Sequence, residues 1–173
     1  MDAENRKTLL DTLDQSQQTV SDAIAGVTEE KAAIKPAPER WSVLECMEHV
    51  ALVEHLLFQR LVQGGKAAAS MQDTEREEAI RKRLPDRSFK GEAPEHARPA
   101  GRYASLAEAH GVFLTNRKRT RDFIETTDED LYFRVSEHRL FGKISGHDQA
   151  LIIAYHSARH AGQIREIREA IQA

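Results

Sequence analysis

Residues 150–164 read Ala-Leu-Ile-Ile-Ala-Tyr-His-Ser-Ala-Arg-His-Ala-Gly-Gln-Ile, and this stretch predicts a long helix. Its residues repeat with the period of about 3.6 that places side chains on one face of a helix. The resulting stripe consists of Gln149, Ile152, Ile153, His156, His160, Gln163 and Ile167. Because His156 and His160 are one turn apart on this inward-facing stripe, their imidazoles project side by side. With this spacing one helix can supply two ligands to a single metal ion.

Three more helices are expected from the same periodicity, over residues 4–27, 42–63 and 105–126, and the last helix is expected to begin at Ser145. In three of the four, a serine is followed three residues later by an acidic residue, as in a capping box. These pairs are Ser42 with Glu45, Ser105 with Glu108, and Ser145 with Asp148. Local hydrogen bonding thus predicts where most of the helices begin.

Strand signals are weak throughout the chain. The best candidate, residues 131–135, is short and isolated, and no long segment alternates between apolar and polar residues. Four long helices in a chain of 173 residues predict an all-α protein, a four-helix bundle formed by one domain over residues 1–173.

The connector between the second and third helices, residues 65–104, is much longer than the usual loop of a bundle. It contains Pro85, Pro94 and Pro99 and two charged stretches. A connector of this length can carry the chain back along the bundle, so that the helices on either side of it run parallel. Two alternatives remain open, a lid over one end of the bundle and disorder of the middle portion.

Composition restricts the class of function. The net charge of −3 provides no general attraction to nucleic acid or to an anionic membrane, and no apolar run is long enough to span a bilayer. The N-terminal residues Met-Asp-Ala-Glu-Asn-Arg-Lys do not resemble a secretory signal, and a single cysteine, Cys46, excludes an internal disulfide. We expect a soluble cytoplasmic protein that binds neither nucleic acid nor membranes.

A third imidazole is available from the second helix. His49 follows Glu45 by one turn and shares the apolar side of Val53 and Leu56. A lone histidine at such a position is usually structural, but His156 and His160 face inward from another helix. Three neutral imidazoles would form a site for zinc or a similar divalent ion with one position open. Cys46, on another side of the helix, is not expected to be a ligand.

The other histidines are expected to have no role in this site. His110 is interpreted as a hydrogen-bonded core residue. The remaining four, which fall on polar connectors, a polar helix face or the first turn of the last helix, are expected to be solvated: His55, His96, His138 and His147.

Two motifs in this chain resemble the DinB-like superfamily. They are Trp41-Ser-Val-Leu-Glu45-Cys-Met-Glu-His49 at the start of the second helix and His156-Ser-Ala-Arg-His160-Ala-Gly-Gln-Ile164 in the last. The turn Phe141-Gly-Lys-Ile-Ser145 is also similar to the one that precedes the last helix in that family. The resemblance spans most of the chain, and the two motifs in this order are specific together.

This resemblance implies an up-down-down-up bundle with the long crossover between the second and third helices. It also implies a divalent metal ion, zinc or nickel, held by His49, His156 and His160. The family includes bacillithiol S-transferases, mycothiol-dependent isomerases and metal-dependent hydrolases, and its members are commonly homodimers. We therefore also expect a homodimer.

The expected function is that of a metal-dependent enzyme acting on a small molecule, either a hydrolase or a transferase of a low-molecular-weight thiol. The alternative is a non-catalytic metal-binding protein, for example of the stress response. Three residues are candidates for supporting roles. Gln163 is expected to orient a ligand or to make a buried amide hydrogen bond, and Glu45 to hold His49 or only to cap its helix. Arg117 is expected to bind a substrate carboxylate or to belong to a solvated basic face.

Overall fold

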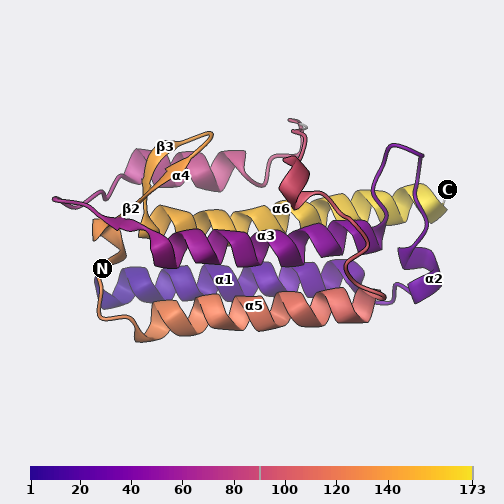
Figure 1. The fold of residues 1–173 in the computed structure, drawn as a ribbon, viewed down its shortest axis with the longest axis horizontal. Helices are drawn as coiled ribbons and strands as arrows, with labels where there is room; N and C mark the ends of the chain where they lie inside the picture. Colours follow the sequence, from indigo (N-terminus) through magenta and orange to yellow (C-terminus); the bar gives the residue numbers. More distant parts are fainter. Residues whose placement is uncertain (90, 173) are drawn as a thin grey trace.

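The computed structural model describes residues 1–89 and 91–172, and four long helices dominate it (Figure 1). These helices are α1 (Ala3–Ile24), α3 (Val43–Gln63), α5 (Leu106–Thr126) and α6 (Gly146–Gln172). In Figure 1, α1 and α6 run in one direction while α3 and α5 run in the other. The helices therefore follow the up-down-down-up order, and the expected four-helix bundle is confirmed.

Local hydrogen bonds place the helix starts where the sequence predicts them. Ser42 and Glu45 form a complete capping box at the start of α3. At the start of α6, the Asp148 carboxylate accepts a hydrogen bond from the Ser145 amide at 2.8 Å, and the Asp148 amide donates to the Ser145 hydroxyl at 3.0 Å. The end of α1 lies three residues before the expected position 27, and a short helix, α2 (Glu29–Ala32), follows it.

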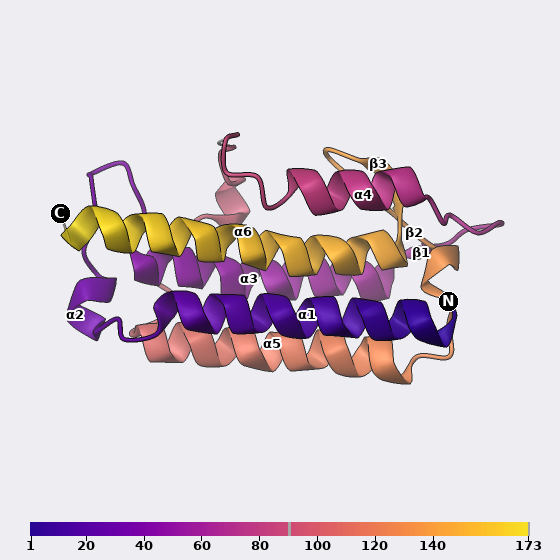
Figure 2. The same ribbon diagram turned by 180° about the vertical axis from the view of Figure 1, so that it is seen from behind.

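The connector between α3 and α5 folds along the side of the bundle. It contains β1 (Gly65–Lys66), α4 (Thr74–Arg83) and a 3₁₀ turn, η1 (Glu95–Ala97). Seen from the opposite side, α4 lies alongside α6 (Figure 2). Its one buried apolar residue, Ile80, is fully enclosed and joins the core of the bundle. The described part of the connector is thus a crossover along the flank, as its length predicts, and it does not close an end.

A small antiparallel sheet precedes α6, which differs from the isolated strand expected over 131–135. Leu131–Phe133 form a 3₁₀ turn, η2, and the strands β2 (Arg134–His138) and β3 (Gly142–Ser145) follow. β2 lies between β1 and β3, with Val135 opposite both Gly65 and Ser145. The strand begins later than expected because Leu131 and Tyr132 are buried in the turn, where the Asp130 side chain accepts from the Tyr132 amide.

Arg117 of α5 is a charged residue that is completely enclosed in the bundle. Its guanidinium donates two hydrogen bonds to the Glu54 carboxylate, at 2.7 and 3.0 Å. The other three go to the Leu13 carbonyl and the hydroxyls of Ser16 and Ser157. All five donors of the guanidinium are therefore used. This placement corrects both sequence-based interpretations, because Arg117 lies in the core, away from solvent, and gives all its donors to groups of the protein.

His147 is also buried, which corrects the expectation that it is solvated. Its ring packs on that of Tyr132, with centroids 4.7 Å apart, and its Nδ1 lies 3.3 Å from Glu77 Oε1. The Tyr132 hydroxyl donates to the same oxygen at 3.2 Å. These contacts join α4 to the start of α6. Burial alone would raise the pKa of Glu77, but the nearby His147 ring and the Tyr132 hydroxyl together lower it.

Replacing Glu77 with glutamine is expected to loosen α4 from α6, because it removes the charged partner of His147. A carboxyl group with a lowered pKa stabilises the fold above its usual value of 4.5, and this contribution is lost as the pH falls below it. Hydrogen-exchange protection of the α4 amides should fall in Glu77→Gln at pH 7 and in the wild type in acid. Glu78, exposed on the same helix, supplies the control Glu78→Gln. Equal protection of the α4 amides in Glu77→Gln and Glu78→Gln would contradict the role of Glu77 in holding α4 to α6.

Candidate metal centre

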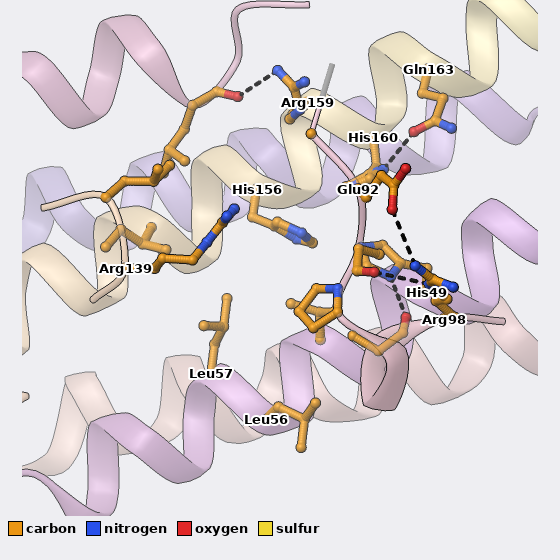
Figure 3. Close-up of a pocket in the computed structure, with 18 of the residues that line it drawn as sticks. His49, Leu56, Leu57, Glu92, Arg98, Arg139, His156, Arg159, His160 and Gln163 are labelled. Carbon is orange, nitrogen blue, oxygen red and sulfur yellow. Dashed lines mark hydrogen bonds and ion pairs between the residues drawn. The ribbon is translucent and has the colours of Figure 1, made fainter. Parts of the chain in front are cut away.

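Three histidines meet between α3 and α6, at the position that the sequence predicts. His49 comes from α3, and His156 and His160 come from successive turns of α6 (Figure 3). The centroids of the three rings lie 4.5–5.3 Å apart. One nitrogen from each ring lies within 4.8 Å of the others, which is close enough for all three to hold one ion. The structure thus brings together residues that are more than 100 positions apart in the sequence.

Hydrogen bonds orient two of these rings. His49 Nδ1 lies 2.6 Å from the carbonyl oxygen of Ala97, in η1, and His160 Nδ1 lies 2.9 Å from Gln163 Oε1. Because these oxygens only accept, each Nδ1 carries the proton and each Nε2 keeps its lone pair. Metal-bound histidines are held in the same way, by an oxygen that accepts from the second ring nitrogen. The donor set therefore fits a divalent ion.

The surroundings of the three rings also favour their neutral forms. Burial lowers the pKa of His156 and of His160 well below the usual 6.5, and the charge of neighbouring histidines lowers both further. Burial also lowers the pKa of His49, although its bond to Ala97 acts in the opposite direction. Neutral imidazole is the form that binds metals, so the lone pairs are available at neutral pH.

Cys46 lies beneath this cluster. Its Sγ is 3.7 Å from His160 Nδ1 and 3.8 Å from the carbonyl oxygen of the same residue. Burial raises the pKa of the Cys46 thiol to about 12. Burial thus disfavours the thiolate, the form that binds metals, and Cys46 is not among the side chains whose ligand atoms converge. Its role here is to pack against the imidazole of His160.

The cluster opens into a cleft of about 900 Å³, a volume within the usual range of ligand-binding pockets. Leu56 and Leu57 of α3 line one side, η1 lines another, and the loop between β2 and β3 reaches over it (Figure 3). Trp41 also lines the cleft, with its ring 4.9 Å from that of His49 and 6.4 Å from that of His160. An indole beside the histidines shields them from bulk water.

Gln163 and Glu45, the two candidates for supporting a histidine, have different roles in the structure. Gln163 lines the cleft, and its side-chain oxygen accepts the hydrogen bond that orients His160. Glu45 serves the capping box and forms an ion pair with Lys35 at 2.7 Å, while the Nδ1 partner of His49 is Ala97. Glu45 therefore acts as a helix cap.

Two contributions to the cleft are missing from the sequence interpretation. The carbonyl of Ala97 holds His49, and main-chain groups leave no trace in a pattern of side chains. His138 and Arg139 line the cleft from the β2–β3 hairpin, where His138 is half-buried instead of solvated. The weak strand signal over residues 131–135 overlaps the start of this hairpin and is the nearest indication of it in the sequence.

Residues 12–164, most of the chain, match the sequence profile of the DinB superfamily. The chain belongs to the DinB superfamily. The uncharacterized protein YuaE of Bacillus subtilis strain 168 is 26% identical to this chain over 149 residues, covering 86% of this chain and 90% of YuaE.

Two solved structures share the fold. YfiT from Bacillus subtilis is described as a probable metal-dependent hydrolase with an unusual four-helix bundle topology, and it matches 99% of this chain and 90% of its own with a TM-score of 0.64. A conserved protein from Enterococcus faecalis matches 99% of this chain and 98% of its own with a TM-score of 0.66. The sequence identities are 13% and 18%, so these matches establish the similarity of the fold alone. Within the described residues, no helix is long and apolar enough to cross a membrane.

Proposed function

We propose that this protein is a divalent-metal-dependent enzyme in which His49, His156 and His160 hold the ion. One observation carries the proposal: three imidazoles in their neutral form converge at the base of a cleft. The cluster contains three ligand groups and no fourth among the described residues. Structural zinc sites are closed by four protein ligands, while catalytic sites keep a position open for water or substrate. Zinc and nickel both suit imidazole ligands.

Hydrolysis is the reaction class that the comparisons favour, because YfiT is described as a probable metal-dependent hydrolase. A divalent ion bound by three histidines lowers the pKa of a coordinated water to about 7, or deprotonates a coordinated thiol. The residues of this chain have supporting tasks. Gln163 and the Ala97 carbonyl hold two of the rings, while Trp41 and Leu57 exclude bulk water from one side of the cleft.

Transfer of a low-molecular-weight thiol is a second candidate, favoured by the composition of the cluster. The ligand groups of the cluster are imidazoles alone. Two carboxylates, Glu39 and Glu92, line the cleft, and Glu92 is paired with Arg98 at 3.3 Å. A carboxylate base is the usual partner of a metal in amide hydrolysis. A thiol that loses its proton on coordination requires no such base.

Metal analysis of the purified protein, followed by a screen for turnover, tests the proposal. The metal-free protein would be reloaded with zinc or nickel and the bound metal measured after gel filtration. The loaded and metal-free forms would then be compared on ester and amide substrates, and on transfer of bacillithiol, mycothiol and glutathione to electrophiles. Stoichiometric metal and turnover that depends on it support the proposal. A wild-type protein that binds no divalent ion refutes it, and binding without turnover favours the non-catalytic alternative.

Gln163→Ala is expected to weaken metal binding by about 10- to 100-fold, the usual effect of removing a group that orients a metal-bound histidine. Trp41 is the only tryptophan of the chain and lies next to two of the histidines, so quenching of its fluorescence by Ni²⁺ measures the affinity. Gln172→Ala, an exposed glutamine on the same helix, is the control and should bind Ni²⁺ as the wild type does. Unchanged affinity in Gln163→Ala would show that the hydrogen bond does not support a ligand.

A further inference from the structure

The part of the cleft nearest His156 is lined by cationic side chains. Arg139, at the tip of the β2–β3 hairpin, extends across the cleft toward His156 (Figure 3). Arg60, near the end of α3, lines the same region. Both side chains are exposed, and neither forms a hydrogen bond or ion pair with any described residue. Two guanidinium groups are thus available to a ligand.

Three of the other arginines that line the cleft already have partners. Arg87 forms two hydrogen bonds with the Glu166 carboxylate, at 3.0 and 2.7 Å, and Arg98 pairs with Glu92. Arg159 donates to main-chain carbonyls of the connector, including that of Asp86. These three side chains are used to hold the crossover in place. Arg139 and Arg60 differ from them because no such contact occupies their donors within the described residues.

The electrostatics of this region agree with the geometry. Arg60 and Arg139 line the cleft together with His138, and their positive charges add to the effect of burial, which is the main cause that lowers the pKa of His138. Three neutral imidazoles leave the charge of a bound divalent ion uncompensated. The metal and the arginines together therefore favour a negatively charged molecule in the cleft.

The hairpin tip is held in a defined conformation. The Leu140 amide donates to His138 Nδ1 at 3.2 Å, and the rings of His138 and Phe141 stack with centroids 5.2 Å apart. Gly142 closes the turn with a φ of 65°, a conformation that favours glycine. Arg139 lies within this turn, so its main chain is positioned before any ligand arrives, which lowers the entropy cost of binding.

We propose that Arg139, with Arg60 beside it, binds an anionic group of the substrate, a carboxylate or a phosphate, while the reacting atom lies at the three histidines. A guanidinium suits both groups because its planar donors match two oxygens at once. The hairpin that precedes α6 is then a specificity element. The inference rests on the proposed metal-dependent function and adds the chemical class of the substrate.

Calorimetric titration of the zinc-loaded protein tests this inference with thiols that differ in charge. Mercaptosuccinate carries two carboxylates, 2-mercaptoethyl phosphate carries a phosphate, and thioglycerol carries no charge. We expect the better anionic thiol to bind about tenfold more tightly than thioglycerol, which corresponds to one charge-assisted contact, and its affinity to fall with salt. Comparing the affinities of the two anionic thiols shows whether the site prefers a carboxylate or a phosphate. Arg139→Ala should remove most of the difference while leaving thioglycerol binding within about twofold.

Lys143→Ala provides the matched control, because Lys143 is an exposed cation on the same hairpin that does not line the cleft. It should bind all three thiols as the wild type does. Equal binding of charged and uncharged thiols by the wild type would overturn the inference while leaving the metal site intact, as would an Arg139→Ala variant that keeps the preference.

A protein that binds neither zinc nor nickel refutes the proposed function and is recognised separately by metal analysis. In that case succinate is titrated into the metal-free protein and compared with succinamide, its uncharged diamide. A preference for succinate that depends on Arg139 would support the proposed anion site. Equal binding of succinate and succinamide would refute it.

Discussion

His160→Ala is expected to abolish stoichiometric binding of a divalent ion. The variant loses one of the three imidazoles of the cluster, together with the hydrogen bond that links it to Gln163. The two remaining histidines come from different helices, so neither helix alone would offer a chelating pair. His49→Ala should also lower the metal content, because it removes the only ligand from α3, but it leaves the pair His156 and His160 on α6. Metal content after gel filtration and Ni²⁺ quenching of Trp41 fluorescence measure the loss.

His55→Ala is the matched control for these variants. His55 lies on α3 like His49, is half-buried, and does not belong to the cluster. It should bind one equivalent of metal with wild-type affinity. Circular dichroism of each metal-free variant would verify that the bundle is folded before the metal is added. Full stoichiometry and unchanged affinity in a folded His160→Ala variant would refute the assignment of the ligands.

Arg117→Met is expected to lower the free energy of unfolding by about 3–5 kcal/mol, the usual cost of removing one partner from a buried ion pair. The Glu54 carboxylate, 2% exposed, would lose both hydrogen bonds from the guanidinium and would stay in the core without a counter-charge. The hydroxyls of Ser16 and Ser157 would lose their shared partner as well. Urea unfolding followed by circular dichroism measures the change.

A double variant separates the cost of the unpaired charge from the packing of the site. Glu54→Leu combined with Arg117→Met removes both charges and should recover much of the stability lost in Arg117→Met alone. Lys118→Met, next along α5 but exposed and paired only with Asp122, should change stability by less than about 0.5 kcal/mol. A loss below 1 kcal/mol in Arg117→Met would show that the pair is not buried as described.

The positions of the helices could be predicted because their signals are local. The capping partners Ser42 and Glu45 lie three residues apart, and the inward stripe of α6 repeats within one continuous segment. The three histidines were likewise predictable, since each lies on the apolar side of its own helix. Their convergence requires only that α3 and α6 be neighbours, as they are in the bundle.

The roles of Arg117, His147 and Arg139 could not be read in the same way. Each is a polar residue whose sequence neighbours suggest exposure, and in each case a distant segment determines the environment. The partners of Arg117 come from α1, α3 and α6, and that of His147 comes from the crossover. Arg139 reaches the cleft because β2 pairs with β3 and turns the hairpin tip toward α6.

The sequence by itself therefore determined the helices, their order in the bundle and the three imidazoles, because helical period and capping depend on residues that are close along the chain. The tertiary structure alone decided which polar side chains are buried, which ring nitrogens face the cleft, and which arginines remain free for a ligand. These properties depend on hydrogen bonds and burial between segments far apart in sequence. The pattern of side chains does not reveal a main-chain partner such as the carbonyl of Ala97, which orients His49 from within the crossover.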